Sequence, residues 1–269
     1  MSTQSRVAIL GAGVMGETLL SAILGSGVPT ERVVVSEKRE ERAAELRERH
    51  GVTVTDNVDA VRGADIVLVV VKPQDVPALL DEIAGVVADG ATIVSLAAGI
   101  RIATYQAVLG DATGVIRAMP NTPALVGEGM FGVSPNDAVA DDRLAEVVEL
   151  LGSGGEVVVV PEAAQDAVTA VSGSGPAYVF YLAEAMIAAG VDLGLEPEVA
   201  RTLATQTILG AARLLAESDD PADELRRRVT SPNGTTHAAI TTFDDRGVRA
   251  GLEDGVRAAA VRSAELSGS

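Results

Sequence analysis

Residues 7–16 read VAILGAGVMG, a run of four apolar residues that leads directly into a G-x-G-x-x-G motif. Apolar residues at helical spacing follow the motif as far as Leu24. A strand, a glycine-rich turn and a helix, in this order, form the setting in which the motif binds a dinucleotide. The stretch therefore predicts the first βαβ unit of a Rossmann domain, in preference to a glycine-rich turn that holds no ligand.

The three glycines of the motif have different steric tasks. Gly11 allows the tight turn, Gly13 lets the backbone approach a pyrophosphate, and Gly16 permits close packing of the helix on the strand. Val14 and Met15 begin the helix, and N–H groups at a helix N-terminus bind phosphate groups. All five residues are predicted to bind the cofactor.

Further strands are predicted downstream, because continuous apolar runs are typical of strands buried on both faces of a parallel sheet. The clearest such run is residues 64–71, and the other predicted strands are residues 32–35, 52–55, 91–97, 114–119 and 157–160. Ligands of open α/β sheets bind at the carboxyl ends of the strands. The cofactor site is therefore predicted to include residues near these ends, namely Asn57, Val71, Lys72, Pro73, Ala97, Ala98, Gly99, Met119, Pro120 and Asn121.

The end of the second predicted strand, at Ser36, is where a dinucleotide enzyme distinguishes NADP from NAD. A serine followed by basic residues favours the 2′-phosphate of NADP, and Lys38 and Arg39 follow here. Glu37 favours NAD, because an acidic residue accepts a hydrogen bond from the ribose 2′-hydroxyl. The pattern favours NADPH and leaves NADH open. The alternative is that these charged residues form only the first turn of a helix.

The pattern changes after Pro161, where apolar residues fall at helical spacing. We predict a Rossmann domain at residues 1–161 and an all-α domain at residues 162–269. Alanine and glycine are abundant on the helices and large side chains are few, which predicts a homodimer, or a multiple of it, with a shared core. The predicted helices cover residues 163–171, 177–189, 198–216, 224–229, 236–243 and 248–266, with a break at residues 172–176.

A hydroxyl-rich turn at residues 229–237, VTSPNGTTH, leads into the fifth of these helices. Free N–H groups at a helix start, with hydroxyls beside them, suit a carboxylate. An ordinary helix cap gives the same pattern. A dinucleotide site at one end of the chain and an anion site at the other together favour an oxidoreductase that acts on a small acid.

The composition argues against several classes of function. A formal net charge of −17 argues against nucleic acid or an anionic membrane as a partner. The chain has no cysteine, and His50 and His237 are too few for a histidine-rich metal site, so no metal is predicted. Residues 1–6 lack the apolar segment of a signal peptide, and no apolar run is long enough to span a bilayer. We therefore expect a cytoplasmic protein.

Five segments resemble pyrroline-5-carboxylate reductase, and together they extend over essentially the whole chain. The glycine motif is generic, whereas R-x-M-P-N-T-P, S-G-S-G-P-A-Y and T-S-P-x-G-T-T, in this order and spacing, are specific. The segments are residues 11–16, 71–74, 117–123, 172–178 and 229–236. The sequence departs from the family at Asn233, where a second glycine is usual. Asparagine tolerates positive φ better than other non-glycine residues, so the loop conformation is expected to survive.

The resemblance implies NAD(P)H-dependent reduction of 1-pyrroline-5-carboxylate to L-proline by a Rossmann domain and an interlocking helical dimer. It implies that residues 119–121 shape the nicotinamide pocket. It places Thr169 near the ring nitrogen of the imine and makes it, with Ser174, a candidate catalytic residue; a helix-packing role is the alternative for both. The residues implied to bind the substrate carboxylate are Ser231, Asn233, Gly234, Thr235 and Thr236.

The nitrogen of a cyclic imine can itself be protonated, which makes C5 electrophilic without a strong protein acid. This fits a helical half without lysine, since the lysines of the chain are Lys38 and Lys72. A β-hydroxyacid dehydrogenase has the same arrangement of a Rossmann domain and a helical domain, but it relies on a lysine in its helical part. A cofactor-binding protein without turnover is the remaining alternative, and the retained nicotinamide and carboxylate segments argue against it.

Overall fold

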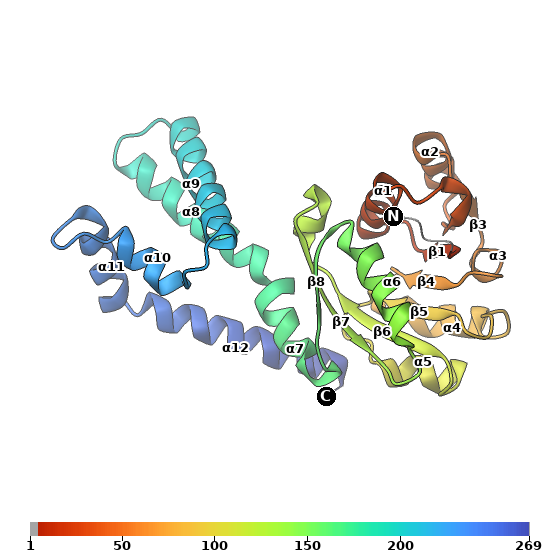
Figure 1. Ribbon diagram of the computed structural model, residues 1–269. Coiled ribbons are helices and arrows are strands. Elements are labelled where there is room, and N and C mark those ends of the chain that lie inside the picture. Colours follow the sequence, from red (N-terminus) through yellow and green to blue (C-terminus); the bar gives the residue numbers. More distant parts are fainter. Residues whose placement is uncertain (1–4, 269) are drawn as a thin grey trace. The chain divides into compact units, whose positions relative to one another are not determined.

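The computed structural model of the chain, drawn in Figure 1, describes residues 5–268. The expectation about a signal peptide rests mainly on residues 1–4, which lie outside the described residues. Contacts within the chain divide it into two units, Met1–Ser174 with Ala259–Ser269, and Gly175–Ala258. The predicted boundary at Pro161, between a dinucleotide-binding domain and a helical domain, stays a prediction.

The first unit is built on an eight-stranded sheet in the order β3-β2-β1-β4-β5-β6-β7-β8. The strands are β1 (Val7–Leu10), β2 (Val33–Ser36), β3 (Thr53–Thr55), β4 (Ile66–Val69), β5 (Thr92–Ser95), β6 (Gly114–Met119), β7 (Gly129–Pro135) and β8 (Gly155–Val159). Neighbouring strands are parallel, apart from the antiparallel pair β6–β7. The predicted doubly wound, mostly parallel sheet is confirmed, with its topological switch point between β1 and β4.

Helices cover both faces of this sheet, because successive side chains of a strand point to opposite faces. The helices are α1 (Val14–Gly25), α2 (Glu40–His50), α3 (Asn57–Val61), α4 (Val76–Ile83), α5 (Ile102–Leu109) and α6 (Asp141–Gly152). In β1, Val7 and Ile9 join a buried cluster with α1, α2 and α6, whereas Ala8 and Leu10 join one with α3, α4 and α5. Short 3-10 turns connect several elements, namely η1 (Thr30–Arg32), η2 (Pro73–Asp75), η3 (Thr122–Val126) and η4 (Glu162–Ala164).

The apolar pattern predicts three strands too long, at residues 52–55, 64–71 and 91–97, and misses β7 altogether. The run at residues 64–71, for example, contains the shorter strand Ile66–Val69. β7 escapes the pattern because its seven residues include two glycines and a proline, which are depleted in strands. Gly132 fits here because a Cβ atom would lie 2.5 Å from Cγ1 of Val168. The predicted strand at 157–160 is β8, and it closes the sheet as expected.

The helix interruption predicted at residues 172–176 is present, and it takes the form of a π-helical turn and not of a loop. After α7 (Gln165–Val168), the chain forms a π-helical turn, η5 (Thr169–Gly173), and α8 (Gly175–Asp192) begins two residues later. The backbone N–H of Ser174 donates to the carbonyl of Thr169 at 2.8 Å, which closes the wider turn. Small residues therefore widen the helix at this point instead of ending it.

The second unit consists of helices. They are α8, α9 (Pro197–Glu217), α10 (Ala222–Arg228), α11 (Thr235–Asp245) and the first part of α12 (Val248–Ser267), whose end belongs to the first unit. Ala200 and Ala204 are the buried hydrophobic residues of this unit, whereas large side chains such as Tyr181, Leu193 and Leu203 are exposed. Within residues 5–268, no helix has the length and apolar character needed to cross a membrane.

Candidate cofactor and substrate sites

The glycine-rich turn between β1 and α1 has the geometry of a phosphate cradle. Gly11 has a φ of +97°, and a Cβ atom there would lie 3.1 Å from the carbonyl carbon of Val70. A Cβ atom on Gly16 would lie 2.1 Å from the Gly11 carbonyl oxygen, so the helix can approach the turn only without a side chain. Gly13 has open space around its Cα, and it is the N-cap of α1 without a side-chain cap. The turn leaves the helix N-terminus open to an anion.

A cavity of about 370 Å³ lies beside this turn, at the carboxyl ends of β1, β2 and β4. The cavity therefore lies at the switch point, where open α/β sheets bind ligands. It brings together six of the predicted cofactor residues, Gly11, Ser36, Lys38, Arg39, Asn57 and Val71. It is also lined by Glu37, Asp75, Ala78 and Leu79, of which the last three were not predicted. The apolar spacing of α4 at Val76, Leu79, Leu80 and Ile83 was the available signal for that wall.

The hydroxyl of Ser36 is already engaged inside the protein. Ser36 is 2% exposed, and its Oγ donates to Oδ1 of Asn57. Nδ2 of Asn57 in turn donates to Oε2 of Glu82 at 2.8 Å. A phosphate oxygen only accepts hydrogen bonds, so the predicted phosphate-binding role of Ser36 requires its hydroxyl to turn its proton away from Asn57. The serine–asparagine pair fixes the wall of the cavity.

Glu37 and Arg39 form a local pair at the rim of the same cavity. The guanidinium of Arg39 donates to both carboxylate oxygens of Glu37, at 3.1 and 3.2 Å, and the Arg39 N–H donates at 2.9 Å. Burial alone would raise the pKa of Glu37, but these hydrogen bonds lower the pKa below its usual value. Glu37 is thus an ionised acceptor. Lys38 is 82% exposed, with its Nζ 3.9 Å from Glu82.

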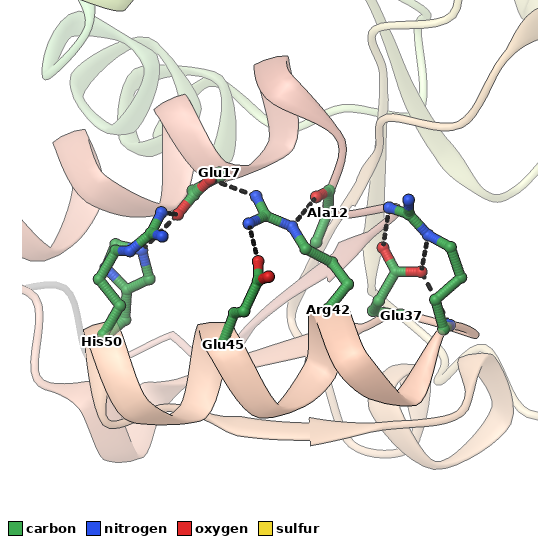
Figure 2. Close-up of polar contacts among 8 residues, drawn as sticks. Ala12, Glu17, Glu37, Arg42, Glu45 and His50 are labelled. Carbon is green, nitrogen blue, oxygen red and sulfur yellow. Dashed lines mark hydrogen bonds and ion pairs between the residues drawn. The ribbon is translucent and has the colours of Figure 1, made fainter.

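A second charged cluster joins α2 to the helix that follows the glycine turn, as Figure 2 shows. Glu17 on α1 accepts hydrogen bonds from Arg42, Arg49 and His50, all on α2. Burial alone would raise the pKa of Glu17, but these bonds lower it from 4.5 to about 2. Arg42 also donates to Glu45 at 2.7 Å. The sequence pattern does not predict this cluster, which joins α1 to α2.

Replacing Glu17 with Gln is expected to destabilise the protein in a pH-dependent way. Because the folded state lowers the pKa of Glu17 from 4.5 to about 2, its ionised form stabilises the fold above pH 4.5 and that stabilisation is lost as the pH falls towards 2. Thermal unfolding of Glu17→Gln and wild type should differ most near neutral pH and converge at low pH. Glu45→Gln, which removes a half-exposed carboxylate, is the matched control and should have a smaller effect. A difference that does not change with pH would contradict this reading.

The predicted nicotinamide segment follows β6 and packs on the π-helical turn. Asn121 Oδ1 accepts from the N–H of Met130 at 2.8 Å, and its Nδ2 donates to the carbonyl and Oγ of Ser172 at 3.4 and 3.3 Å. A Cβ atom on Gly173 would lie 2.7 Å from Cε of Met119. Met119, Pro120 and Asn121 are all partly buried. Their contact with a nicotinamide stays a prediction.

Thr169 opens the π-helical turn, and its hydroxyl donates to the Gln165 carbonyl at 2.8 Å. That bond agrees with the alternative given above, in which the Thr169 hydroxyl serves helix packing. It also leaves the lone pairs of Oγ1 free to accept a hydrogen bond from a ligand. Ser174 is partly buried, and its backbone N–H closes the same turn.

The hydroxyl-rich turn of the second unit leads into α11 as predicted. Gly234 is the N-cap residue and α11 starts at Thr235, with no side-chain cap bond. Asn233 has a φ of +61° and is the one non-glycine residue with positive φ between residues 5 and 268. This agrees with the expectation that asparagine can adopt the positive φ of the usual glycine. Gly234 itself has a φ of −81°. A need for positive φ therefore does not explain the glycine at this position; a Cβ atom there would instead lie 3.1 Å from the Ser231 carbonyl oxygen.

Several predicted cofactor residues lie outside the cavity beside the glycine turn. Ala97 is buried in the core, and Lys72 and Pro73 are exposed at the start of η2. Gly99 has a φ of +75°, and a Cβ atom there would be in ordinary van der Waals contact with the Leu266 carbonyl oxygen at 3.4 Å. The positive φ, and not the packing of the C-terminal helix, is thus the reason for glycine at this position. Among the described residues, no cluster of His, Cys, Asp or Glu could hold a metal ion.

Comparison with known proteins matches both halves of the chain. The family described as pyrroline-5-carboxylate reductase dimerisation matches residues 162–266. The family described as NADP oxidoreductase, coenzyme F420-dependent, matches residues 6–99. The chain is 44% identical over 269 residues to the pyrroline-5-carboxylate reductase of Pseudomonas aeruginosa, with 99% of this chain and 98% of that relative covered.

Solved structures agree with the sequence comparison. A pyrroline-5-carboxylate reductase from Coxiella burnetii is 33% identical and superposes with a TM-score of 0.95, covering 98% of this chain and 99% of that one. The Plasmodium falciparum pyrroline carboxylate reductase with NADP bound is 27% identical, with a TM-score of 0.86 and 98% of each chain covered. The cradle, the sheet and the helical half thus recur together, and the chain belongs to the pyrroline-5-carboxylate reductase family.

Proposed function

We propose that this protein reduces 1-pyrroline-5-carboxylate to L-proline with a hydride from NADPH, the last step of proline biosynthesis. The observation that carries the proposal is the family membership along the whole chain, which includes the three specific segments. The plan of a β-hydroxyacid dehydrogenase is less suitable, because the helical half contains no lysine. A location in the cytoplasm is part of the same proposal.

The structure fits a nicotinamide dinucleotide. The cradle at Gly11, Gly13 and Gly16 has the strained turn, the open space and the uncapped helix N-terminus that a pyrophosphate requires. Val14 and Met15 would supply N–H donors, and Asn57 and Val71 would line the adenosine side. When bound, the cofactor supplies the hydride; the strand ends position it and limit the access of water. Residues 72–73, 97–99 and 119–121 are proposed as further walls of this site.

The substrate carboxylate is assigned to the turn at the start of α11. The N–H groups of Thr235 and Thr236 lie in the first turn of a helix of eleven residues without a side-chain cap. They are therefore available to an anion, with the partial positive charge of the helix end behind them. Ser231 and Asn233 shape the turn, and Gly234 keeps its entrance free of a side chain.

Thr169 is assigned to the nitrogen of the imine. Its hydroxyl proton is directed to the Gln165 carbonyl, so Oγ1 is oriented as an acceptor. A protonated imine carries an N–H, which requires an acceptor and not a second donor. Thr169 would thus stabilise the iminium form, whose C5 accepts the hydride, without giving up a proton. Ser174 is proposed to support the same end of the site through the turn that it closes.

The functional assembly is proposed to be a homodimer or a multiple of dimers. The helical half is the region that matches the family's dimerisation domain. Its exposed apolar side chains provide the surface that two chains would bury together. We accordingly propose that residues 1–161 bind the cofactor and that residues 162–269 bind the substrate and form the dimer.

NADPH is expected to give a higher kcat/KM than NADH. Lys38 and Arg39 line the cavity at the end of β2, although Glu37 competes for Arg39. The double variant Lys38→Met with Arg39→Met should therefore impair NADPH much more than NADH, because NADH carries no 2′-phosphate. Steady-state kinetics with both cofactors test this. An equal loss for both, or a wild-type preference for NADH, would mean that Glu37 controls the site.

A turnover assay with pyrroline-5-carboxylate, combined with a titration of nicotinamide fluorescence, tests the proposed function. Binding of NADPH together with substrate-dependent oxidation supports it. Binding without turnover would identify a silent cofactor-binding protein, and turnover with a 3-hydroxy acid would identify the alternative dehydrogenase.

A further inference from the structure

We propose that Asn121 is a positioning residue for the reaction, which ties the π-helical turn η5 to the strand end and so fixes the hydroxyl of Thr169. The inference rests on the proposed function, because it requires Thr169 to face the imine. It changes the role of Asn121, whose amide we place within the protein and not on the nicotinamide.

The side-chain amide of Asn121 is bonded at both ends. Its Oδ1 accepts from the N–H of Met130 at 2.8 Å, at the start of β7. Its Nδ2 reaches 51 residues along the chain and donates to the carbonyl and Oγ of Ser172. Asn121 therefore connects the loop after β6, the start of β7 and the π-helical turn, all within the first unit.

The turn is also held at its other end. Gln165, fully buried, donates from Nε2 to Oγ of Ser134 at 2.8 Å and to the carbonyl of Gly132 at 3.1 Å, which anchors α7 to β7. The hydroxyl of Thr169 then donates to the carbonyl of Gln165. Thr169 thus lies between two anchors, Gln165 before it and the Asn121–Ser172 bond after it.

A π-helical turn needs such anchors, because it is rare and less favourable than the α-helical alternative. Its closing bond runs from the Ser174 N–H to the Thr169 carbonyl, and the chain could close a tighter turn if Ser172 were free to move. Gly173 packs against Cε of Met119, so a shift of the turn would also disturb the predicted nicotinamide wall. Loss of the Asn121 bond is therefore expected to displace Thr169 and Met119 together.

Asn136 provides a matched control for Asn121. It follows β7, accepts from the N–H of Val115 at 3.0 Å and donates to the carbonyl of Thr113 at 2.9 Å. It thus joins β6 and β7 as Asn121 does, but at the opposite end of β6, away from the strand ends that carry the cofactor residues.

The test compares Asn121→Ala with Asn136→Ala in kcat, in KM for substrate, in NADPH affinity and in thermal stability. Small misplacements of a reacting group can lower rates by about a hundred-fold, so we expect kcat of Asn121→Ala to fall by about ten- to hundred-fold. NADPH affinity by fluorescence should fall far less than kcat, because Met119 is one of many residues proposed to contact the cofactor. Asn136→Ala should lose similar thermal stability and keep kcat.

Three outcomes would overturn the proposal. An equal loss of kcat in both variants would show a general structural role, and a weaker NADPH affinity with unchanged kcat would show a direct cofactor contact. An unchanged Asn121→Ala enzyme would show no role. Should Asn121→Ala fail to fold, Asn121→Asp keeps the acceptor for Met130 and loses the donor to Ser172, and it should show the same fall in kcat. A wild-type protein without turnover would instead contradict the proposed function.

Discussion

Replacement of Thr235 with Val is expected to lower kcat/KM for pyrroline-5-carboxylate by about ten- to hundred-fold. Val keeps the backbone N–H but lacks the hydroxyl that would donate to the carboxylate, and a hydrogen bond to a charged group contributes roughly 1.5–3 kcal/mol. Thr235 starts α11, and the N-cap before it provides no side-chain bond of its own. NADPH affinity without substrate should stay near the wild-type value, because this turn is assigned to the carboxylate alone. Steady-state kinetics normalised to folded protein, with a separate fluorescence titration, measure both quantities.

Gly234→Val should have a larger effect than Thr235→Val. Its Cβ would press on the Ser231 carbonyl oxygen at 3.1 Å and its methyl groups would cover the N–H donors. Thr242→Val is the control, because Thr242 lies on the same helix and its hydroxyl donates to the Ala238 carbonyl at 2.9 Å. A helix-cap role without a ligand predicts a stability loss of about 1 kcal/mol and unchanged kinetics per folded enzyme, and that result would remove the carboxylate assignment.

Introduction of a charge on the exposed apolar face of α9 is expected to abolish assembly and, with it, nearly all activity. Val199, Leu203 and Leu214 share this face by helical spacing, and each is about half exposed in the single chain. Leu203→Glu would bury a carboxylate in the shared core, and an unpaired buried charge destabilises by several kcal/mol, which a two-fold dimer incurs in both chains.

Thr205→Glu serves as the control, because Thr205 is exposed and lies on the opposite side of the same helix. Sedimentation at micromolar concentration should find wild type and Thr205→Glu as oligomers and Leu203→Glu as a destabilised smaller species. A folded, active Leu203→Glu monomer would show that the apolar face has another purpose.

The Rossmann half could be predicted from the sequence because its signals are local. The run before Gly11 forms a buried strand whose residues alternate between the two cores, and β6 has the predicted bounds. The positive φ at Asn233 also follows from residue type. These features depend on the preference of a single residue or on a short period.

Other features could not be predicted, because they depend on residues far apart in the chain. β7 is a strand in spite of its glycines, since Gly132 makes room for Val168. The small residues at 172–176 interrupt the α-helix as predicted, but the form of the interruption, a π-helical turn held by Asn121 and Gln165, depends on these distant contacts. The pairing of Glu37 with Arg39 is likewise a choice of rotamer that residue spacing does not predict.

The central claim is that a hydride passes to C5 of the cyclic imine, and an isotope experiment tests it most directly. The wild-type protein would be incubated with pyrroline-5-carboxylate and NADPH deuterated at C4 of the nicotinamide, and the product analysed by mass spectrometry and NMR. We predict L-proline with one deuterium at C5 for each NADPH consumed. Bound NADPH without labelled proline, or oxidation of NADPH with the label released to solvent, would contradict the account.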